Sequence, residues 1–352
     1  MPGPTLTDIA RAAEVSTATV SHALNGTGRL GESTRRRVRE VAAALGYGSR
    51  RTPLTRTGTL GLAVTTYAGA PWNYVQVPYF SRLLTAAAAT AHALGYALTV
   101  LPAERGGETL WHTLTVDGML LLDSPEDDRV LRALRARGIP VVFDGRPADP
   151  HPDDVWVDND HTTTTREVLD HLAAAGARRI ALHAGYGREY YTGAVTRAYE
   201  EWCREHGCEP SVIPFDPEDA PGHAFDRAFS DRALSGRDSS DRTLSGPASS
   251  DRSCDAVHSL YDPGGRQVLA AAARHGLRIP DDLLLVCASE DPAYAETDPP
   301  VSTVTLRPET IAETAVTTLV ARLDPALPAP SPGGLTVPAR LCPRTSTGRP
   351  SG

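Results

Sequence analysis

From residue 59 onward, short apolar runs alternate with longer segments of helical periodicity, and this alternation limits the possible folds more than any other feature of the chain. The runs TLGLAV, MLLL and IPVVF are continuously apolar, which is typical of strands buried on both faces of a parallel sheet. Segments between them, such as DDRVLRALRARG, carry apolar residues at helical spacing. About a dozen such elements exceed one six-stranded sheet, so we predict an α/β core of two doubly wound parallel-sheet subdomains.

The first 58 residues differ from this core in charge and in periodicity. They hold nine arginines and four acidic residues, a net charge of +5; the whole chain carries −8, so the remainder carries −13. A small basic head on an acidic body indicates a module that binds a polyanion. Apolar spacing in the head predicts a small all-α domain of three helices, with N-caps at Thr5 or Thr7, at Ser16, and at Ser33 or Thr34.

Residues 6–26 read LTDIARAAEVSTATVSHALNG, a pattern of two short helices joined by a tight turn. The second helix begins with small polar residues, and such a helix can enter the DNA major groove with its first residues at the base edges. The alternative is a helical hairpin that serves only for packing. The residue order resembles the helix-turn-helix of the LacI family of bacterial transcription repressors, L-x-D-[IV]-A-x-x-A-x-V-S-x-x-T-V-S-x-x-L-N, and TRRRVREVAAALGY resembles the third helix of that family.

The resemblance to the LacI family covers about residues 5–347, and the core resembles periplasmic sugar-binding proteins. It implies a cytoplasmic, nucleoid-associated bacterial repressor that binds a palindromic operator on double-stranded DNA as a homodimer. A small-molecule effector would bind between the core subdomains. It implies no enzymatic activity and no cofactor. The alternative function is a soluble protein that binds or processes a small molecule without controlling DNA.

The same resemblance assigns roles to residues of the head. Members of the family hold phosphates or the groove wall at eight positions, which here are Thr5, Leu6, Thr7, Ser16, Thr19, Ser21, Asn25 and Thr34. They read bases at Thr17, Ala18 and His22, and a histidine cannot make the bidentate contact with guanine that arginine makes. In the shortened hinge, Leu54 is the only apolar residue that could wedge into the minor groove; it could equally be a plain linker residue.

The effector site departs from the sugar-binding members of the family. Val195, Tyr261, Ser289 and Gly145 occupy or adjoin positions where those members carry polar groups that bind hydroxyls. We therefore predict that simple pentoses and hexoses do not bind through the usual contacts of the family. The alternatives are an effector that is larger or more aromatic, sugar-derived or aromatic in kind, or no effector at all. The candidate effector residues are Tyr67, Trp72, Asp144, Tyr186, Tyr190, Arg197, Tyr261, Asp262, Ser289 and Glu290.

The chain is expected to divide as follows. Residues 1–47 form the helix-turn-helix domain, 48–58 the hinge, 59–347 the core and 348–352 a tail. Within the core, the N-subdomain comprises about 59–156 plus 303–325, and the C-subdomain about 157–300 plus 326–347. In residues 230–253 the tripeptide Ser-Asp-Arg recurs every ten residues and apolar residues are sparse, which predicts a low-complexity insertion.

Other protein classes lack support in the sequence. No apolar run is long enough for a transmembrane helix, and no signal peptide is expected. The five scattered cysteines are interpreted as reduced thiols, and no metal site is expected. The chain has neither a G-x-S-x-G motif nor a phosphate-binding loop. His183, which ends an apolar strand, is interpreted as a cleft or core histidine and not as a general base.

Overall fold

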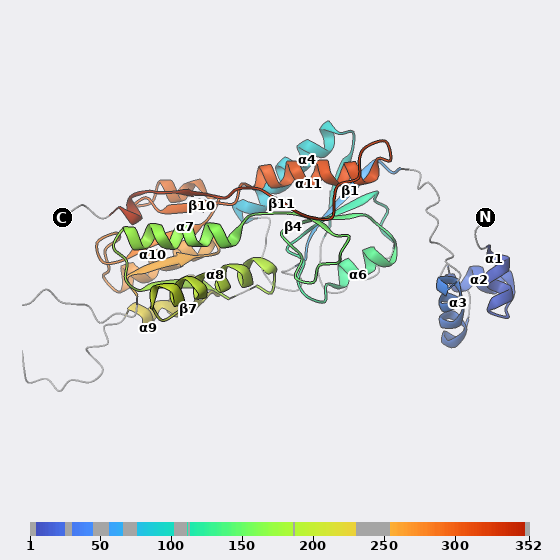
Figure 1. The fold of residues 1–352 in the computed structure, drawn as a ribbon, viewed down its shortest axis with the longest axis horizontal. Helices are drawn as coiled ribbons and strands as arrows, with labels where there is room; N and C mark the ends of the chain where they lie inside the picture. The colour runs from blue at the N-terminus through green and yellow to red at the C-terminus, as the bar shows by residue number, and fades with distance from the viewer. Residues whose placement is uncertain are drawn as a thin grey trace, which may run out of the picture. The chain divides into compact units, whose positions relative to one another are not determined.

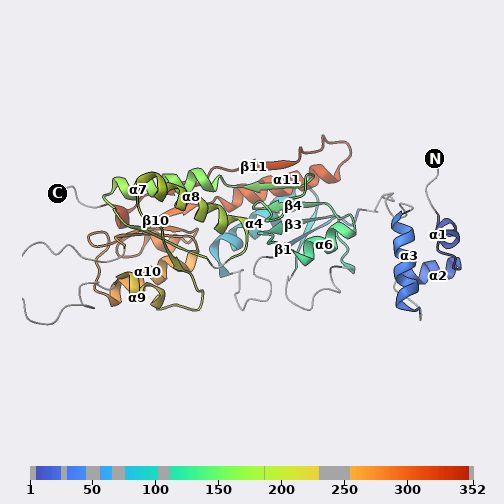
Figure 2. The same ribbon diagram turned by 60° about the horizontal axis from the view of Figure 1, so that its bottom comes forward.

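The computed structural model forms two compact units, Met1–Thr57 and Gly58–Gly352, which we call the head and the core. Figures 1 and 2 show the ribbon of both units. The structure describes residues 5–24, 30–44, 56–65, 76–101, 111, 113–185, 187–229 and 254–348. The predicted insertion, residues 230–253, and most of the predicted hinge lie outside the described residues.

The head consists of three helices, α1 (Leu6–Ala12), α2 (Thr17–Leu24) and α3 (Glu32–Ala44). Their apolar faces enclose a small core: Ile9, Ala10, Ala13, Val20, Ala23, Val38 and Ala42.

The starts of the first two helices match the predicted caps. Thr5 caps α1 in a capping box with Asp8, and the amide of Thr19 donates to Ser16 Oγ at 3.1 Å. The predicted cap of the third helix is wrong. The helix begins at Glu32, because the carbonyl of Gly31 already accepts bonds from the amides of Thr34 and Arg35, at 3.0 and 3.1 Å. Ser33 and Thr34 therefore lie within its first turn.

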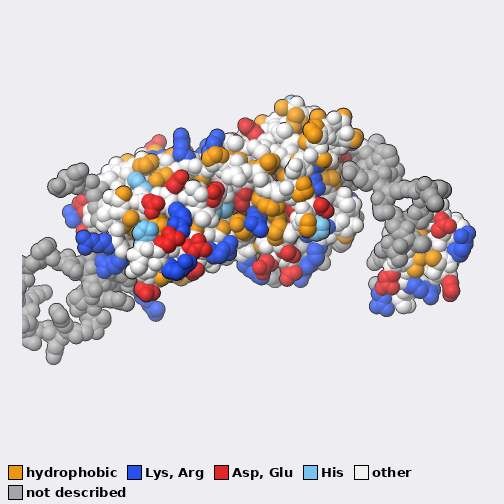
Figure 3. Space-filling view, in the orientation of Figure 1, with side chains coloured by type: hydrophobic (Ala, Val, Ile, Leu, Met, Phe, Trp, Pro, Cys, Tyr) orange, Lys and Arg blue, Asp and Glu red, His pale blue; other side chains and the backbone are white. Residues whose placement is uncertain are grey.

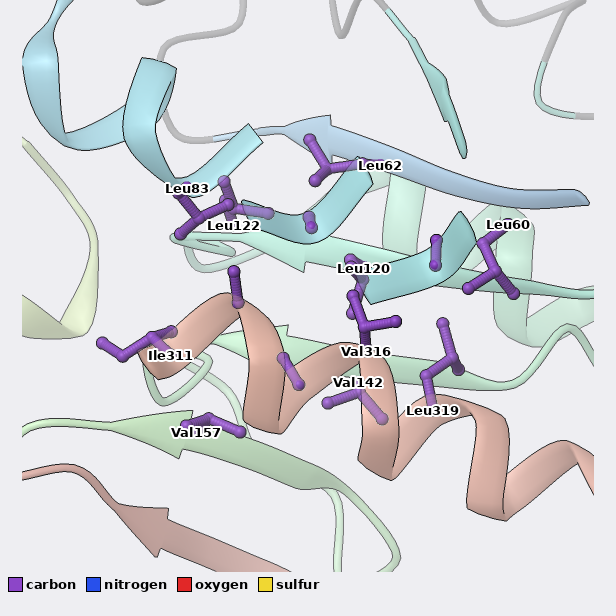
Figure 4. Packing of buried hydrophobic residues seen from close by; sticks show 14 of the residues in the cluster. Leu60, Leu62, Leu83, Leu120, Leu122, Val142, Val157, Ile311, Val316 and Leu319 are labelled. Atoms are coloured by element: carbon purple, nitrogen blue, oxygen red, sulfur yellow. The ribbon is translucent and has the colours of Figure 1, made fainter. Parts of the chain in front are cut away.

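The first half of the core is a parallel six-stranded sheet in the order β11-β5-β4-β3-β1-β2. Its strands are β1 (Thr59–Val64), β2 (Ala97–Val100), β3 (Gly118–Leu122), β4 (Val141–Asp144), β5 (Val155–Asp158) and β11 (Gly333–Thr336). One face is covered by α4 (Pro78–Ala93) and α11 (Pro308–Leu323), the other by α6 (Arg129–Ala136). Figure 4 shows the first face: Leu120, Leu122 and Val142 of the sheet meet Ile311, Val316 and Leu319 of α11.

The second half repeats this arrangement with the order β12-β10-β9-β8-β6-β7. Its strands are β6 (Ile180–Ala184), β7 (Ser211–Pro214), β8 (Ala256–Ser259), β9 (Leu284–Ala288), β10 (Ser302–Thr305) and β12 (Arg340–Cys342). Only β12 runs antiparallel to its neighbour. The helices are α7 (His161–Ala174), α8 (Tyr190–His206), α9 (Asp226–Phe229) and α10 (Asp262–Arg274). The predicted core of two doubly wound parallel sheets is confirmed.

The chain crosses between the halves three times: after β5, after β10 and after β11. Asn159 ties these crossings together, because its side-chain amide donates to the carbonyls of Leu306 at 3.1 Å and Val337 at 2.8 Å. The crossings also correct two predicted boundaries. Strand β10 belongs to the second half although residues 303–325 were assigned to the first, and β11 belongs to the first half although 326–347 were assigned to the second. Hydrogen-bond pairing of β10 with β9 and of β11 with β5 causes both differences.

Three general features complete the fold. In the described part of the chain, no helix is long and apolar enough to cross a membrane. All five cysteines are free thiols. On the face of the core shown in Figure 3, arginine and acidic side chains lie intermixed; the exposed pair of Arg166 and Glu205, joined at 2.6 and 2.7 Å, is one example of such pairing.

Candidate functional site

Helix α2 presents one polar face to solvent and packs the other into the head. Val20 and Ala23 are fully buried, whereas Thr17, Ala18 and His22 are exposed. This division follows from helical spacing, because residues three apart share a face. The three residues predicted to read bases therefore lie together on the open side of a short helix, as a helix in a DNA groove requires.

The residues predicted to hold phosphate are distributed around this helix. Thr5, Thr7 and Ser16 are exposed near helix starts, and Thr19, Ser21, Leu6 and Thr34 are half-buried. Some hydroxyls also serve the fold, since Thr5 donates to Asp8 at 2.7 Å and Ser16 lies 2.8 Å from the Thr19 hydroxyl. Asn25 and Leu54 lie outside the described residues.

The core contains a cleft between its two halves, with a cavity volume of about 80 Å³. It lies where the carboxyl ends of the strands of both sheets approach the crossings, the usual position of ligands in open α/β sheets. The cleft is lined by Val77, Tyr79, Phe80, Asp123, Asp144, Gly145, Asp158, Asn159, His161, Tyr191, Leu260, Tyr261, Asp262, Ala288, Ser289, Glu290 and Leu306.

Three aspartates form the wall that the first half contributes. Asp123, Asp144 and Asp158 stand at the ends of the adjacent strands β3, β4 and β5. Burial and the neighbouring Asp158 raise the pKa of Asp144 to about 7, although the hydrogen bond from Tyr79 opposes the shift. Burial, together with the charges of Asp144, Glu189 and Asp158, raises the pKa of Asp123 well above its usual range.

The wall of the second half also contains carboxylates, but these have partners within the protein. Asp262 accepts a hydrogen bond from Ser289. Glu290 accepts from the Thr305 hydroxyl at 2.8 Å and from the Leu306 amide at 2.7 Å, and it pairs with Arg82 of α4 at 2.9 Å. This wall is therefore largely neutralised by contacts inside the fold.

Aromatic rings line the remaining surface. Tyr79 and Phe80 come from the start of α4, and their rings meet edge to face with centroids 5.3 Å apart. Tyr191, at the start of α8, lies against His161 with centroids 4.8 Å apart. The ring of Tyr261 packs on Phe215. Rings and carboxylates together make a site suited to a ligand that has both an apolar face and polar groups.

The structure brings some of the predicted effector residues together and not others. Asp144, Tyr261, Asp262, Ser289 and Glu290 line the cleft. Among the described residues around it, Tyr190 and Arg197 do not line the cavity. The guanidinium groups of Arg146 and Arg197 lie 4.9 and 5.8 Å from the centroid of the Tyr190 ring. Tyr67, Trp72 and Tyr186 lie outside the described residues.

Several residues of the cleft were not predicted. The two most informative are Asp123 and Asp158, each of which directly follows or ends an apolar strand. An acidic residue at that position in three successive strands is a signal readable in the sequence, because the carboxyl ends of parallel strands meet at one sheet edge. His183, by contrast, lies fully buried among Phe215 and Phe225, away from the cleft.

A helix-turn-helix head joined to a core of two periplasmic-binding-protein-like halves is the architecture of ligand-controlled DNA-binding regulators. Residues 5–49 match the family of bacterial regulatory proteins of the lacI type. Residues 66–216 match the periplasmic binding proteins and sugar-binding domain of the LacI family, and residues 169–347 match the periplasmic-binding-protein-like domain.

Individual relatives agree with these matches. The chain is 26% identical over 349 residues to the transcriptional regulator CelR of Thermobifida fusca, covering 96% of this chain and 95% of the relative. It is 26% identical over 331 residues to the repressor PurR of Aliivibrio fischeri strain MJ11, with 91% of each chain covered.

Solved structures give the same result. A CelR–cellobiose complex superposes with a TM-score of 0.69 at 25% identity, covering 97% of this chain and 99% of that one. The Lac repressor dimer bound to operator and the anti-inducer ONPF superposes with a TM-score of 0.65 at 21% identity, covering 98% and 99%, and shows the shared fold. The chain belongs to the LacI family and is a DNA-binding transcriptional regulator.

Proposed function

We propose that this regulator is a homodimeric repressor whose heads bind the two halves of a palindromic operator and whose cleft binds a small effector. Effector binding changes the relative closure of the two halves of the core and thereby the affinity for the operator. CelR, the relative solved with cellobiose, supports a ligand-controlled core, and the Lac repressor dimer on operator supports the mode of DNA binding.

The observation that carries the DNA-binding part of the proposal is the exposed face of α2. Thr17, Ala18 and His22 lie on it as the base-reading set, beside the exposed hydroxyls of Ser16 and Thr5. The head as a whole carries +5, which attracts the phosphate backbone independently of sequence. Base contacts from three or four side chains of one helix then supply specificity.

The effector part of the proposal depends on the crossings. The halves are joined by three segments that Asn159 holds together, so a ligand that contacts both walls alters how the halves close. Asp144 of the first wall and Tyr261, Asp262, Ser289 and Glu290 of the second are the predicted residues positioned to contact such a ligand.

Selection of DNA sites from a randomised duplex library tests the reading set. We expect wild-type protein to select a palindrome, and His22→Ala to lose about 1–3 kcal/mol on it and to relax preference at one base pair in each half-site. His92→Ala, at an exposed position of α4 in the core, is the matched control and should keep the full preference. An unchanged preference in His22→Ala would remove this residue from the reading set.

A gel shift with DNA upstream of the protein's own gene separates the proposal from the alternative function. A regulator of this kind should retard that DNA at nanomolar concentration and moderate salt, with affinity falling steeply as salt rises. A protein that only binds or processes a small molecule should show no such complex.

A further inference from the structure

The wall of the cleft contributed by the first half presents hydrogen-bond acceptors that the described parts of the protein leave unmatched. We propose that the effector of this regulator carries an ammonium group and that Asp123 and Asp144 bind it. The inference rests on the proposed function, because it takes the cleft to be the effector site.

The two carboxylates are held next to each other by the sheet. Strands β3 and β4 pair in parallel with Leu122 beside Asp144, and the amide of Asp123 donates to the carbonyl of Asp144 at 3.0 Å. Asp123 Oδ1 lies close over Gly145, since a Cβ atom at that glycine would be 3.1 Å away from it. Gly145 thus leaves room for the Asp123 carboxylate beside Asp144.

These two carboxylates differ from the other three of the cleft in having no cationic partner among the described residues. Asp144 accepts only from the hydroxyl of Tyr79, at 3.0 and 3.1 Å, and the Asp123 carboxylate accepts from none of the described residues. Asp158, by contrast, lies 2.8 Å from His161 Nε2 and accepts from backbone amides. Asp262 lies 3.8 Å from the Arg266 guanidinium, and Glu290 pairs with Arg82.

The side chains that could donate to a neutral ligand are already engaged. Tyr79 donates to Asp144, Asn159 to two backbone carbonyls, and Ser289 to Asp262. A neutral sugar needs donors as well as acceptors, because each hydroxyl does both. An ammonium group only donates, so it matches these two carboxyl groups in their ionised form, and its charge adds strength to each bond.

The aromatic rings near these carboxylates favour the same ligand. Tyr79 hydrogen-bonds Asp144 and packs against Phe80, and both rings line the cleft. A cation over the face of an aromatic ring is attracted by the ring quadrupole, more strongly where water is excluded. Carboxylates flanked by such rings form a cage for an organic cation. Burial and neighbouring carboxylates raise the pKa values of both aspartates, so a bound cation would stabilise their ionised form.

Calorimetric titration of the full-length protein at pH 7 with matched pairs of probes tests the proposal. One pair has a sugar scaffold, the β-1,4-linked glucosamine dimer against cellobiose, and the other an aromatic scaffold, tyramine against 4-ethylphenol. We expect at least one amine to bind ten times more tightly than its neutral partner, about 1.4 kcal/mol. Equal or tighter binding of the neutral members, or no binding of either amine, overturns the proposal.

Variants of the two aspartates test whether the amine binds at Asp123 and Asp144. The double variant Asp123→Asn, Asp144→Asn should lose the tenfold preference for the amine over its neutral partner. Asp127→Asn, a strongly exposed aspartate of the same half, is the matched control and should keep the preference. If the double variant fails to fold, Asp123→Asn alone, at a half-buried position, should reduce the preference for the amine at least threefold. An undiminished preference in these variants overturns the assignment, as does binding of magnesium or calcium chloride in place of both amines.

A gel shift at saturating amine separates this inference from the proposed function. Tight amine binding without any change in operator affinity contradicts effector control, and leaves intact only the assignment of an ammonium-binding site to Asp123 and Asp144. Operator control by a neutral ligand that binds the same cleft supports the proposed function and overturns the inference.

Discussion

The two halves of the core have the same sheet topology and differ in what stands at the carboxyl ends of their strands. The first half places Asp123 and Asp144 there without a cationic partner among the described residues. The second half places Asp262 and Glu290 there and matches them with Ser289, Thr305 and Arg82. The carboxylates in the wall of the second half therefore have partners inside the protein, whereas Asp123 and Asp144 in the wall of the first half lack a cationic partner among the described residues.

This difference between the walls has a consequence for stability: the partnered carboxylates of the second half are compatible with a stable fold, whereas Asp123 and Asp144 lower its stability when they are charged. A buried carboxylate with full hydrogen bonding contributes little or favourably, whereas one without a partner is destabilising in its charged form. Such groups are retained where function needs them. The halves also respond to pH in opposite directions, because the second half buries neutral His183 and His258, whose pKa values burial lowers to about 4.

The largest expected effect is a gain of stability in Asp144→Asn. The folded protein holds a proton on Asp144 up to about pH 7, whereas the unfolded chain releases it near pH 3.8. The free energy of unfolding therefore falls as pH rises from about 4 to 7. Asparagine keeps the acceptor for Tyr79 and removes the charge, so we expect a gain on the order of 3 kcal/mol at pH 8 and almost none at pH 4.

Urea unfolding at both pH values measures this gain. Asp127→Asn, in the same half but exposed, serves as control and should change stability by less than about 0.5 kcal/mol at either pH. A loss of stability in Asp144→Asn at pH 8 would show that this carboxylate is matched inside the protein, and the contrast between the walls would disappear.

The second prediction concerns acid sensitivity of the second half. His183 stays neutral in the folded protein down to about pH 4, whereas the unfolded chain binds a proton near pH 6.5. Stability is therefore lost as pH falls from about 6.5 to 4. His183→Asn, which can still bond Ser259, should reduce the loss over this interval by on the order of 2 kcal/mol, although the variant is less stable at pH 7.

Hydrogen exchange at pH 7 and pH 4.5 assigns the acid sensitivity to a half of the core. We expect strands β6 and β8 to lose protection at the lower pH more than β3 and β4 do. His92→Asn, at an exposed position of α4, should leave the pH dependence unchanged. Equal loss of protection in both halves would contradict the assignment to His183 and His258.

Much of this architecture could be predicted from sequence because it depends on local periodicity. Apolar runs marked the strands of both halves, and the residue order of the head identified the family. The exchange of β10 and β11 between halves could not be predicted in this way. Their assignment depends on pairing with β9 and β5, which are distant in sequence, and short strands of four residues carry no mark of the sheet they join.

In the cleft, too, some residues could be predicted from sequence and others could not. Asp144, Tyr261 and Glu290 were found because resemblance to the family gave their positions. Asp123 was missed although its position after an apolar strand is readable in the sequence, and only the pairing of β3 with β4 shows that it lies beside Asp144. Gly145 was considered only as a lost polar group, although it leaves room for the Asp123 carboxylate. Tyr190 and Arg197 were predicted from nearby motifs, but they stack with each other instead of lining the cavity.

A third prediction concerns the hydrogen bonds by which Asn159 links the three segments that cross between the halves. Asn159 is buried, and its amide bonds the carbonyls of Leu306 and Val337 in the other two crossings. Asn159→Ala leaves the buried Val337 carbonyl and the half-buried Leu306 carbonyl unmatched, so we expect a loss of about 2 kcal/mol in the free energy of unfolding. Asn159→Asp, which lacks the donor but keeps the shape, should be at least as destabilising; a stable aspartate variant would show that the bonds contribute little.

The smallest expected effect on stability is that of replacing Arg82, the cationic partner of Glu290 in the wall of the second half. Arg82 of α4 bonds Glu290 at 2.9 Å, and because the Arg82 side chain is 45% exposed, solvent screens the pair. Glu290 is almost fully buried and keeps its bonds from Thr305 and Leu306, so Arg82→Met should cost about 1 kcal/mol at pH 7. Removing the Arg82 cation also leaves Glu290 without a positive partner, like the aspartates of the first wall, so the variant should raise amine affinity at the cleft by up to threefold.

Arg166→Met, which breaks a surface pair with Glu205, is the control for both measurements. It should change stability by less than about 0.5 kcal/mol and leave amine affinity unchanged. If the two variants behave alike, Glu290 does not depend on Arg82, and the second wall is completed by its hydroxyl and amide donors alone.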